Sequence, residues 1–166
     1  MDKGLRIAKL FGINIRIDWS WLLILLLVIW NLSSAFSQVH PDWGTPFTIV
    51  MGVIAALVFF LSVLMHELAH SLVAKSQGIS VNSITLYLFG GAANIREEPK
   101  SPGSEFIMAF VGPITSLVIG FALLLIAGFG IQLENIAQPM QVLEDLNAFR
   151  TLAVWLGSIN IFLAIF

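Results

Sequence analysis

Residues 47–77 read FTIVMGVIAALVFFLSVLMHELAHSLVAKSQ, a long apolar run that carries His66, Glu67 and His70 near its end. A helix needs about 20 predominantly apolar residues to cross a bilayer, because the lipid offers no hydrogen-bond partner for backbone polar groups. This run therefore predicts a membrane-spanning helix. Three further apolar runs predict spans of the same kind, and they cover residues 19–37, 104–131 and 150–166.

The composition agrees with a membrane protein. Of the 166 residues, 58% are apolar and 11% are charged, and the mean hydropathy is +0.93. A soluble domain is about half apolar and a quarter charged, so a soluble globular protein is excluded. The net charge of −2 comes without a clustered basic surface, so no nucleic-acid partner is expected. Since the chain has no cysteine, any metal would be held by His, Asp or Glu.

The expected fold class is an all-α integral membrane protein with about four transmembrane helices and short β-strands at the cytoplasmic membrane face. A single membrane domain covering residues 1–166 is expected, because the connections are too short for an inserted folded domain. The fourth span is the shortest and stops at Phe166 without a charge or a cap. We therefore expect this span to be incomplete and the chain to be cut short.

The basic residues predict the orientation, because short cytoplasmic loops retain Lys and Arg. All of them except Arg150 lie before the first span, at the end of the second span or between the second and third spans. The expected localisation is a multi-pass protein of the cell membrane with a cytoplasmic N-terminus. The basic residues on the cytoplasmic side are Lys3, Arg6, Lys9, Arg16, Lys75, Arg96 and Lys100.

Two segments outside the spans have the alternation of β-strands. In residues 1–18, isoleucines at 13, 15 and 17 alternate with polar residues, which predicts a short cytoplasmic strand or hairpin. An alternative is the start of a signal peptide cleaved near Ser33-Ser34-Ala35. Residues 79–95 form a second, membrane-associated β segment, in which we expect a strand over 79–89 broken by Gly90-Gly91. This segment is either a re-entrant hairpin or an edge that pairs with an extended peptide.

The motif His66-Glu67-Leu68-Ala69-His70 predicts a metal site. At 3.6 residues per turn, the two histidines lie about 40° apart around the helix and about 6 Å along it, so both rings project from one face. Two such rings can bind Zn²⁺ as metal ligands, while Glu67 reaches a nearby water without binding the metal. Zinc polarises the water and a scissile carbonyl, and Glu67 is the expected catalytic base.

Two alternatives to hydrolysis remain open. One is structural packing, in which the ionisable side chains of the motif hydrogen-bond to one another. The other is a divalent-metal-transporting or metal-binding membrane protein that has no hydrolytic activity. Ionisable residues within a membrane span are costly and by default functional, which favours the metal site over packing.

Further motifs accompany the histidine pair, namely Lys9-Leu10-Phe11-Gly12-Ile13, Asp18-Trp19-Ser20-Trp21, Leu88-Phe89-Gly90-Gly91-Ala92-Ala93, Val111-Gly112-Pro113 and Asn160. With these motifs the chain resembles the site-2 protease family of intramembrane zinc metalloproteases over nearly its whole length. The compact branch of that family lacks a PDZ insertion, as this chain does, and often carries regulatory CBS domains. The resemblance therefore implies a C-terminal regulatory domain in a longer protein.

The resemblance implies an intramembrane zinc endopeptidase that cleaves the transmembrane or membrane-proximal helices of other proteins in the lipid bilayer. We expect the strand near Leu88, Phe89, Gly90 and Gly91 to bind the substrate in an extended form. For Asn160, a place near the active site that polarises substrate or water is as plausible as an interhelical hydrogen bond.

The chain departs from the family in its third zinc ligand, an Asp in a Leu-Asp-Gly motif that this sequence does not contain. We therefore expect this chain to bind zinc weakly and to cleave poorly. The acids weighed as replacements are Asp42, Glu134, Glu144 and Asp145 on the wrong side of the membrane, and Asp18, Glu97, Glu98 and Glu105, which have no reason to enter the bilayer.

Small residues recur every four positions in the third span, at Gly112, Ser116 and Gly120. Such a stripe allows another helix to approach closely, and we expect it to pack against the second or fourth span. Pro113 frees a backbone carbonyl and is expected either to kink this helix near the site or to have no effect on it. His40 lies in an outer loop and is expected to be solvated.

Overall fold

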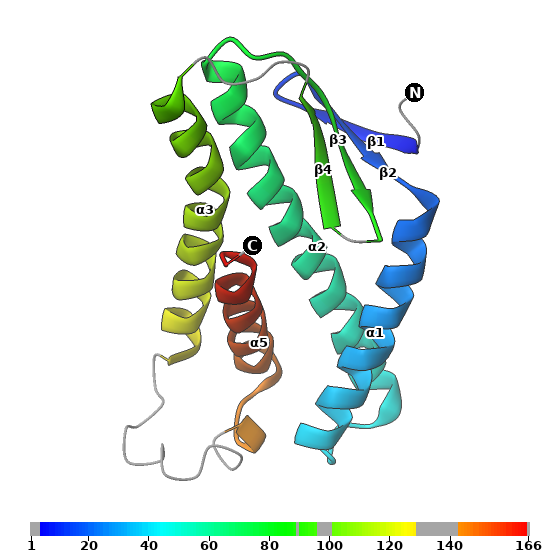
Figure 1. The fold of residues 1–166 in the computed structure, drawn as a ribbon. Helices are drawn as coiled ribbons and strands as arrows, with labels where there is room; N and C mark the ends of the chain where they lie inside the picture. The colour runs from blue at the N-terminus through cyan, green and yellow to red at the C-terminus, as the bar shows by residue number, and fades with distance from the viewer. Residues whose placement is uncertain (1–3, 89, 96–100, 129–142, 166) are drawn as a thin grey trace.

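The computed structural model describes residues 4–88, 90–95, 101–128 and 143–165, and within these ranges it confirms the expected fold class. Four helices accompany a small four-stranded sheet (Figure 1). In chain order the elements are β1 (Leu5–Leu10), β2 (Ile13–Ile17), α1 (Trp19–Val39), α2 (Thr45–Ser76), β3 (Val81–Tyr87), β4 (Gly90–Ile95), α3 (Pro102–Gly128) and α5 (Ala148–Leu163).

Helices α1, α2 and α3 are long and apolar enough to cross a membrane, at 21, 32 and 27 residues. Helix α5 is apolar and shorter, at 16 residues. The chain is therefore a multi-pass membrane protein. Helix α2 is about 48 Å long at 1.5 Å per residue, which exceeds the roughly 30 Å of a bilayer core. One end of α2 is thus free to extend beside the sheet, as Figure 1 shows.

Side-chain caps determine where two of these helices begin. Asp18 precedes α1, and its Oδ1 accepts hydrogen bonds from the backbone N–H of Ser20 at 2.9 Å and from the Ser20 hydroxyl at 2.7 Å. Asn147 precedes α5, and its side-chain oxygen accepts from the backbone N–H of Arg150 at 3.0 Å. Each cap satisfies a backbone donor that has no partner within the first helical turn.

The sheet has the strand order β1-β2-β3-β4. Strands β1 and β2 are antiparallel, β2 and β3 are parallel, and β3 and β4 are antiparallel. The parallel pair is joined through both α1 and α2, which return the chain to the same end of the molecule (Figure 1). Strand β4 is consequently an edge strand, whereas β3 is paired on both sides.

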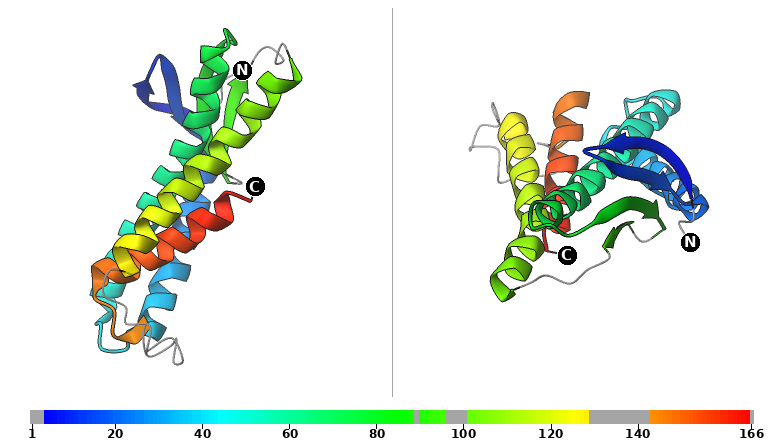
Figure 2. Two further views of the ribbon diagram at one scale, coloured as in Figure 1. Left: turned by 90° about the vertical axis from the view of Figure 1, so that its left-hand side faces the viewer. Right: turned by 90° about the horizontal axis from the view of Figure 1, so that it is seen from above.

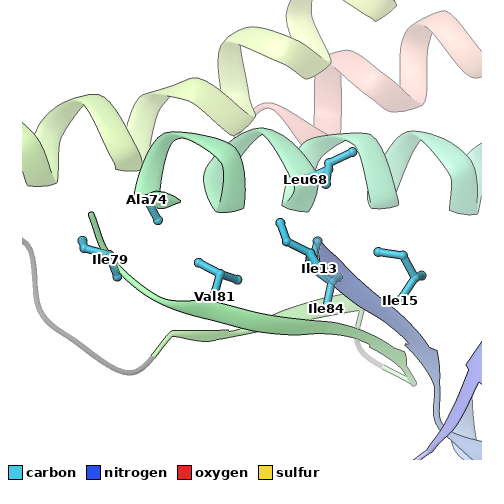
Figure 3. Packing of buried hydrophobic residues seen from close by; sticks show 7 residues of the cluster. All are labelled: Ile13, Ile15, Leu68, Ala74, Ile79, Val81 and Ile84. Carbon is cyan, nitrogen blue, oxygen red and sulfur yellow. The ribbon is translucent and has the colours of Figure 1, made fainter. Parts of the chain in front are cut away.

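One face of the sheet packs against the second half of α2. Ile13 and Ile15 of β2 and Ile84 of β3 are fully buried and point toward this helix (Figure 3). Leu68 lies on the face of α2 that meets them, one residue after Glu67. The hydrophobic contact therefore fixes the sheet beside the histidine motif. The full cluster is Ile13, Ile15, Leu68, Ala74, Ile79, Val81 and Ile84.

The predicted strand does end before Gly90-Gly91, but a second strand follows there that the sequence did not predict. Strand β3 ends at Tyr87, and Gly90 is the first residue of β4 rather than the end of the segment. Gly90 has φ +124°, a conformation that side chains disfavour, so glycine allows the chain to reverse there. The segment forms a β-hairpin whose second strand lies at the edge of the sheet.

The expectation that His40 is solvated was wrong. His40 is 2% exposed, and its ring stacks on Trp43 with centroids 3.8 Å apart. Its Nε2 lies 3.0 Å from Thr151 Oγ1 in the first turn of α5. Because the Thr151 hydroxyl donates to Asn147 O, the His40 N–H donates to Thr151. His40 is buried because the start of α5 packs over the end of α1.

Helix α2 occupies the centre of the bundle, between the pair α3 and α5 on one side and α1 with the sheet on the other (Figures 1 and 2). The small-residue stripe of α3 contacts both expected neighbours. Gly112 faces α2, and Gly120 faces α5, where an added Cβ would lie 2.9 Å from Gly157 O. Pro113 lies inside α3 without ending it.

Candidate metal centre

The two histidines of α2 converge on one point. His66 Nε2 and His70 Nε2 are 3.1 Å apart, and the ring centroids are separated by 4.8 Å. Two nitrogens bound at about 2.05 Å to a tetrahedral zinc ion would lie about 3.3 Å apart. The observed spacing therefore fits two corners of such a site.

Helix α3 holds both rings by their other nitrogens. His66 Nδ1 lies 2.9 Å from Ser116 Oγ, and His70 Nδ1 lies 2.6 Å from the Met108 carbonyl oxygen. A carbonyl can only accept, so His70 Nδ1 carries a hydrogen and the neutral ring presents a lone pair at Nε2. Hydrogen bonds of this kind orient histidines that bind metals.

Gly112 lies on α3 between Met108 and Ser116, directly opposite the two rings. A Cβ added there would lie 2.7 Å from His66 Nε2 and would overlap with His70 Nε2 as well. The absence of a side chain at Gly112 thus leaves the space in which both Nε2 atoms meet. This cradle and the two nitrogen donors fit a zinc ion.

A third ligand is not found within residues 4–88, 90–95, 101–128 and 143–165. No group of three or more His, Cys, Asp or Glu side chains that could hold a metal occurs in this part of the chain. The described acids Asp18, Asp42, Glu105, Glu144 and Asp145 therefore complete no such group. Glu97, Glu98 and Glu134 lie outside the described residues.

Glu67 lies next to the hairpin formed by β3 and β4. A Cβ added to Gly91 would lie 2.5 Å from Glu67 Cγ and 3.1 Å from Glu67 Cδ. Glycine at position 91 therefore allows the edge strand to approach the carboxylate side chain. The burial of Leu68 against the sheet determines this arrangement, because Leu68 and Glu67 are adjacent on α2.

A cavity of about 420 Å³ opens beside His66 and Glu67. Its remaining lining is apolar side chains and glycine, which is typical of a site that binds an apolar segment around a few polar groups. The lining comes from α1, α2, the β3–β4 hairpin and the end of α5. The lining residues are Ile24, Val28, Phe59, Phe60, Val63, His66, Glu67, Leu88, Gly90, Gly91 and Leu163.

Three of the residues expected to bind substrate, Leu88, Gly90 and Gly91, thus line the same cavity as Glu67. Phe89 lies outside the described residues. Asn160 is fully buried and does not line the cavity. Its Nδ2 donates to Ser62 Oγ at 3.1 Å and to its own helix at Leu156 O at 2.7 Å. The hydrogen bond to Ser62 joins α5 to α2 one turn before His66.

The sequence did not reveal two groups that contact the histidines, the Ser116 hydroxyl and the Met108 carbonyl. The small-residue stripe of α3 contains Ser116, but its spacing predicted packing only. A signal was present in the period of four that relates Met108, Gly112 and Ser116, because it places them on one helix face. The spacing does not say which neighbouring side chain that face meets.

The sequence model described as Peptidase family M50 matches residues 54–166. A Synechocystis protein, whose name describes it as a candidate zinc metalloprotease, is 41% identical over 167 residues. The match covers 100% of this chain and 40% of that protein. Rip3 of Mycobacterium tuberculosis, named in the same way, is 32% identical over 169 residues, again covering 100% of this chain and 40% of the relative.

A solved structure agrees with these matches. The site-2 protease from Methanocaldococcus jannaschii superimposes with a TM-score of 0.59 at 28% identity, covering 94% of this chain and 63% of that chain. The present chain spans about 40% of the length of the two curated relatives. The histidine motif, the hairpin and α3 all lie within residues 54–166, which the family model matches.

Proposed function

The chain belongs to peptidase family M50, the site-2 protease family, and on that premise we propose that it forms the catalytic core of an intramembrane zinc endopeptidase. Its substrates are transmembrane proteins, cut in or near their membrane-spanning helices. The observation that carries the proposal is the convergence of His66 Nε2 and His70 Nε2, 3.1 Å apart, beside Glu67 and an apolar cavity.

Each residue of the motif has a separate role in this proposal. His66 and His70 would hold zinc, with a third ligand from outside the described residues. When bound, zinc acts as a Lewis acid toward the attacking water and the scissile carbonyl. The Glu67 carboxylate accepts a proton from the water as the new C–O bond forms. It then donates this proton to the amine nitrogen as the C–N bond breaks.

The edge strand β4 is the proposed substrate platform. A peptide bond in a helix is shielded by its own hydrogen bonds, so the substrate must be extended before it is cut. Among the described residues β4 pairs only with β3, and its first residues, Gly90 and Gly91, line the cavity beside Glu67. Pairing of an extended segment with β4 would place its backbone next to the catalytic carboxylate.

The proposed orientation places the sheet in the cytoplasm. Arg6, Lys9 and Arg16 belong to β1 and β2, and Lys75 lies in the last turn of α2 beside them. Basic residues near membrane spans are retained on the cytoplasmic side. In this orientation the histidine pair is nearer to the cytoplasmic membrane face.

The test of the proposed function is Glu67→Gln in the full-length protein. Cleavage of a transmembrane reporter peptide in proteoliposomes should fall by about 100-fold or more, because the base is removed. Zinc content, measured by elemental analysis, should stay at the wild-type level. Glu105→Gln is the matched control, since Glu105 is exposed in the first turn of α3. Unchanged cleavage in Glu67→Gln would overturn the role of Glu67 as the base. Zinc transport by the wild-type protein without any cleavage would favour the metal-transporting alternative.

A further inference from the structure

Helix α3 holds the two histidine rings with groups of different chemistry. His70 Nδ1 lies 2.6 Å from a backbone carbonyl, that of Met108. His66 Nδ1 lies 2.9 Å from the hydroxyl of Ser116, a side chain with no exposed surface. A carbonyl only accepts hydrogen bonds, whereas a hydroxyl both accepts and donates. The two rings therefore differ in which nitrogen can carry the hydrogen.

This difference between the rings matters because the two Nε2 atoms lie only 3.1 Å apart. His70 presents a lone pair at Nε2, fixed by the Met108 carbonyl. Without a cation, a second lone pair 3.1 Å away would be repelled, so His66 Nε2–H donates to His70 and His66 Nδ1 accepts from Ser116. With a cation between the rings, both Nε2 atoms must present lone pairs. His66 then carries its hydrogen on Nδ1 and donates it to Ser116 Oγ.

We propose that Ser116 is a positioning residue that holds His66 through both of these states and so allows the ring to change tautomer when the metal binds. The inference rests on the proposed zinc site and deepens it. The ring stays neutral throughout, and the hydroxyl turns from donor to acceptor. The alternative is that Ser116 only packs as a small residue against α2, a role that alanine would fill equally well.

Metal affinity distinguishes these two roles. In Ser116→Ala we expect zinc affinity, measured on purified full-length protein by competition with a chromophoric chelator, to fall by about 10- to 100-fold. Ser116→Thr retains the hydroxyl and should restore most of the affinity. Ser71→Ala is the matched control, because Ser71 is also fully buried in the bundle and its hydroxyl has no partner among the described residues. Its affinity should equal that of the wild type.

The tautomer of each ring can be read directly, with the His66 and His70 signals assigned by their loss in His66→Gln and His70→Gln. With ¹⁵N-labelled histidine, His66 should carry its hydrogen on Nε2 in metal-free protein and on Nδ1 after Cd²⁺ or Zn²⁺ is added. His70 should carry it on Nδ1 in both states. Two outcomes would overturn the proposed role of Ser116 and leave the proposed function standing. They are hydrogen on His66 Nδ1 in both states, and equal zinc affinity in Ser116→Ala and wild type. Wild-type protein that takes up no zinc would overturn the proposed function together with this inference.

Discussion

The two sides of α2 differ sharply at the histidine motif. On the side of α3, each ring is hydrogen-bonded and Gly112 leaves only the space where the two Nε2 atoms meet. On the side of α1 and the hairpin, Glu67 borders a cavity of about 420 Å³. The packing of α3 against α2 therefore determines the ligand geometry, while the reacting side remains open. Substitutions on the two sides should therefore have separable effects on metal binding and on turnover.

The largest effect is expected on the α3 side, from Gly112→Ala. The added methyl group would lie within 3 Å of His66 Nε2 and overlap with His70, so the rings could no longer converge. Zinc content and cleavage should both fall to background. Gly103→Ala is the control, because a Cβ there meets no atom within 4 Å. Full zinc occupancy in Gly112→Ala would show that α3 does not set the ligand geometry.

Gly91→Ala should have an intermediate effect, confined to the cavity side. The new Cβ would press on Glu67 Cγ and Cδ and displace the carboxylate, while no atom of either imidazole is among its nearest neighbours. Cleavage should fall by about 10- to 100-fold, since small displacements of a catalytic group are costly. Zinc content should not change. A parallel loss of zinc would mean that the two sides of α2 are not independent.

The smallest effect is expected far from the motif, at Thr151→Val. This change leaves the buried His40 N–H without its acceptor and should lower the free energy of unfolding by about 1 to 2 kcal/mol. Equilibrium unfolding in mixed micelles measures the difference. Zinc content and cleavage should stay at wild-type levels, which makes His40 the example of a buried histidine with a structural role. Reduced zinc binding in Thr151→Val would instead show that the two ends of the bundle are coupled.

The sequence predicted the features that depend on residues close together in the chain, and it did not predict those that depend on distant segments. The meeting of His66 and His70 is local, because four residues separate them on one helix and the helical period alone brings the rings together. The membrane spans were predictable for the same reason, since apolar runs of sufficient length decide them. The contact between Gly91 and Glu67 is not local. It depends on the hairpin turning at Gly90 and on the burial of Leu68 against the sheet.

The rest of the site could not be predicted from the sequence, because it depends on which face of α3 is turned toward α2. A stripe of small residues predicts close packing but leaves open whether the neighbour is a backbone or a catalytic side chain. Ser116 was therefore assigned to packing, although its hydroxyl meets His66. His40 was wrongly predicted to be solvated for a related reason. Its partner Thr151 is distant in the sequence, and no residue near His40 indicates that contact.

The parallel pairing of β2 with β3 restricts how the protein can be inserted during biogenesis. Asn14 pairs with Ser83 and Ile17 with Leu86, although two long apolar helices separate these strands in the chain. Neighbouring strands can only meet on one side of the bilayer, so α1 and α2 must cross it as a pair. If either helix failed to cross, β2 and β3 would be left in different compartments. The sheet can therefore be completed only when both helices have crossed the membrane.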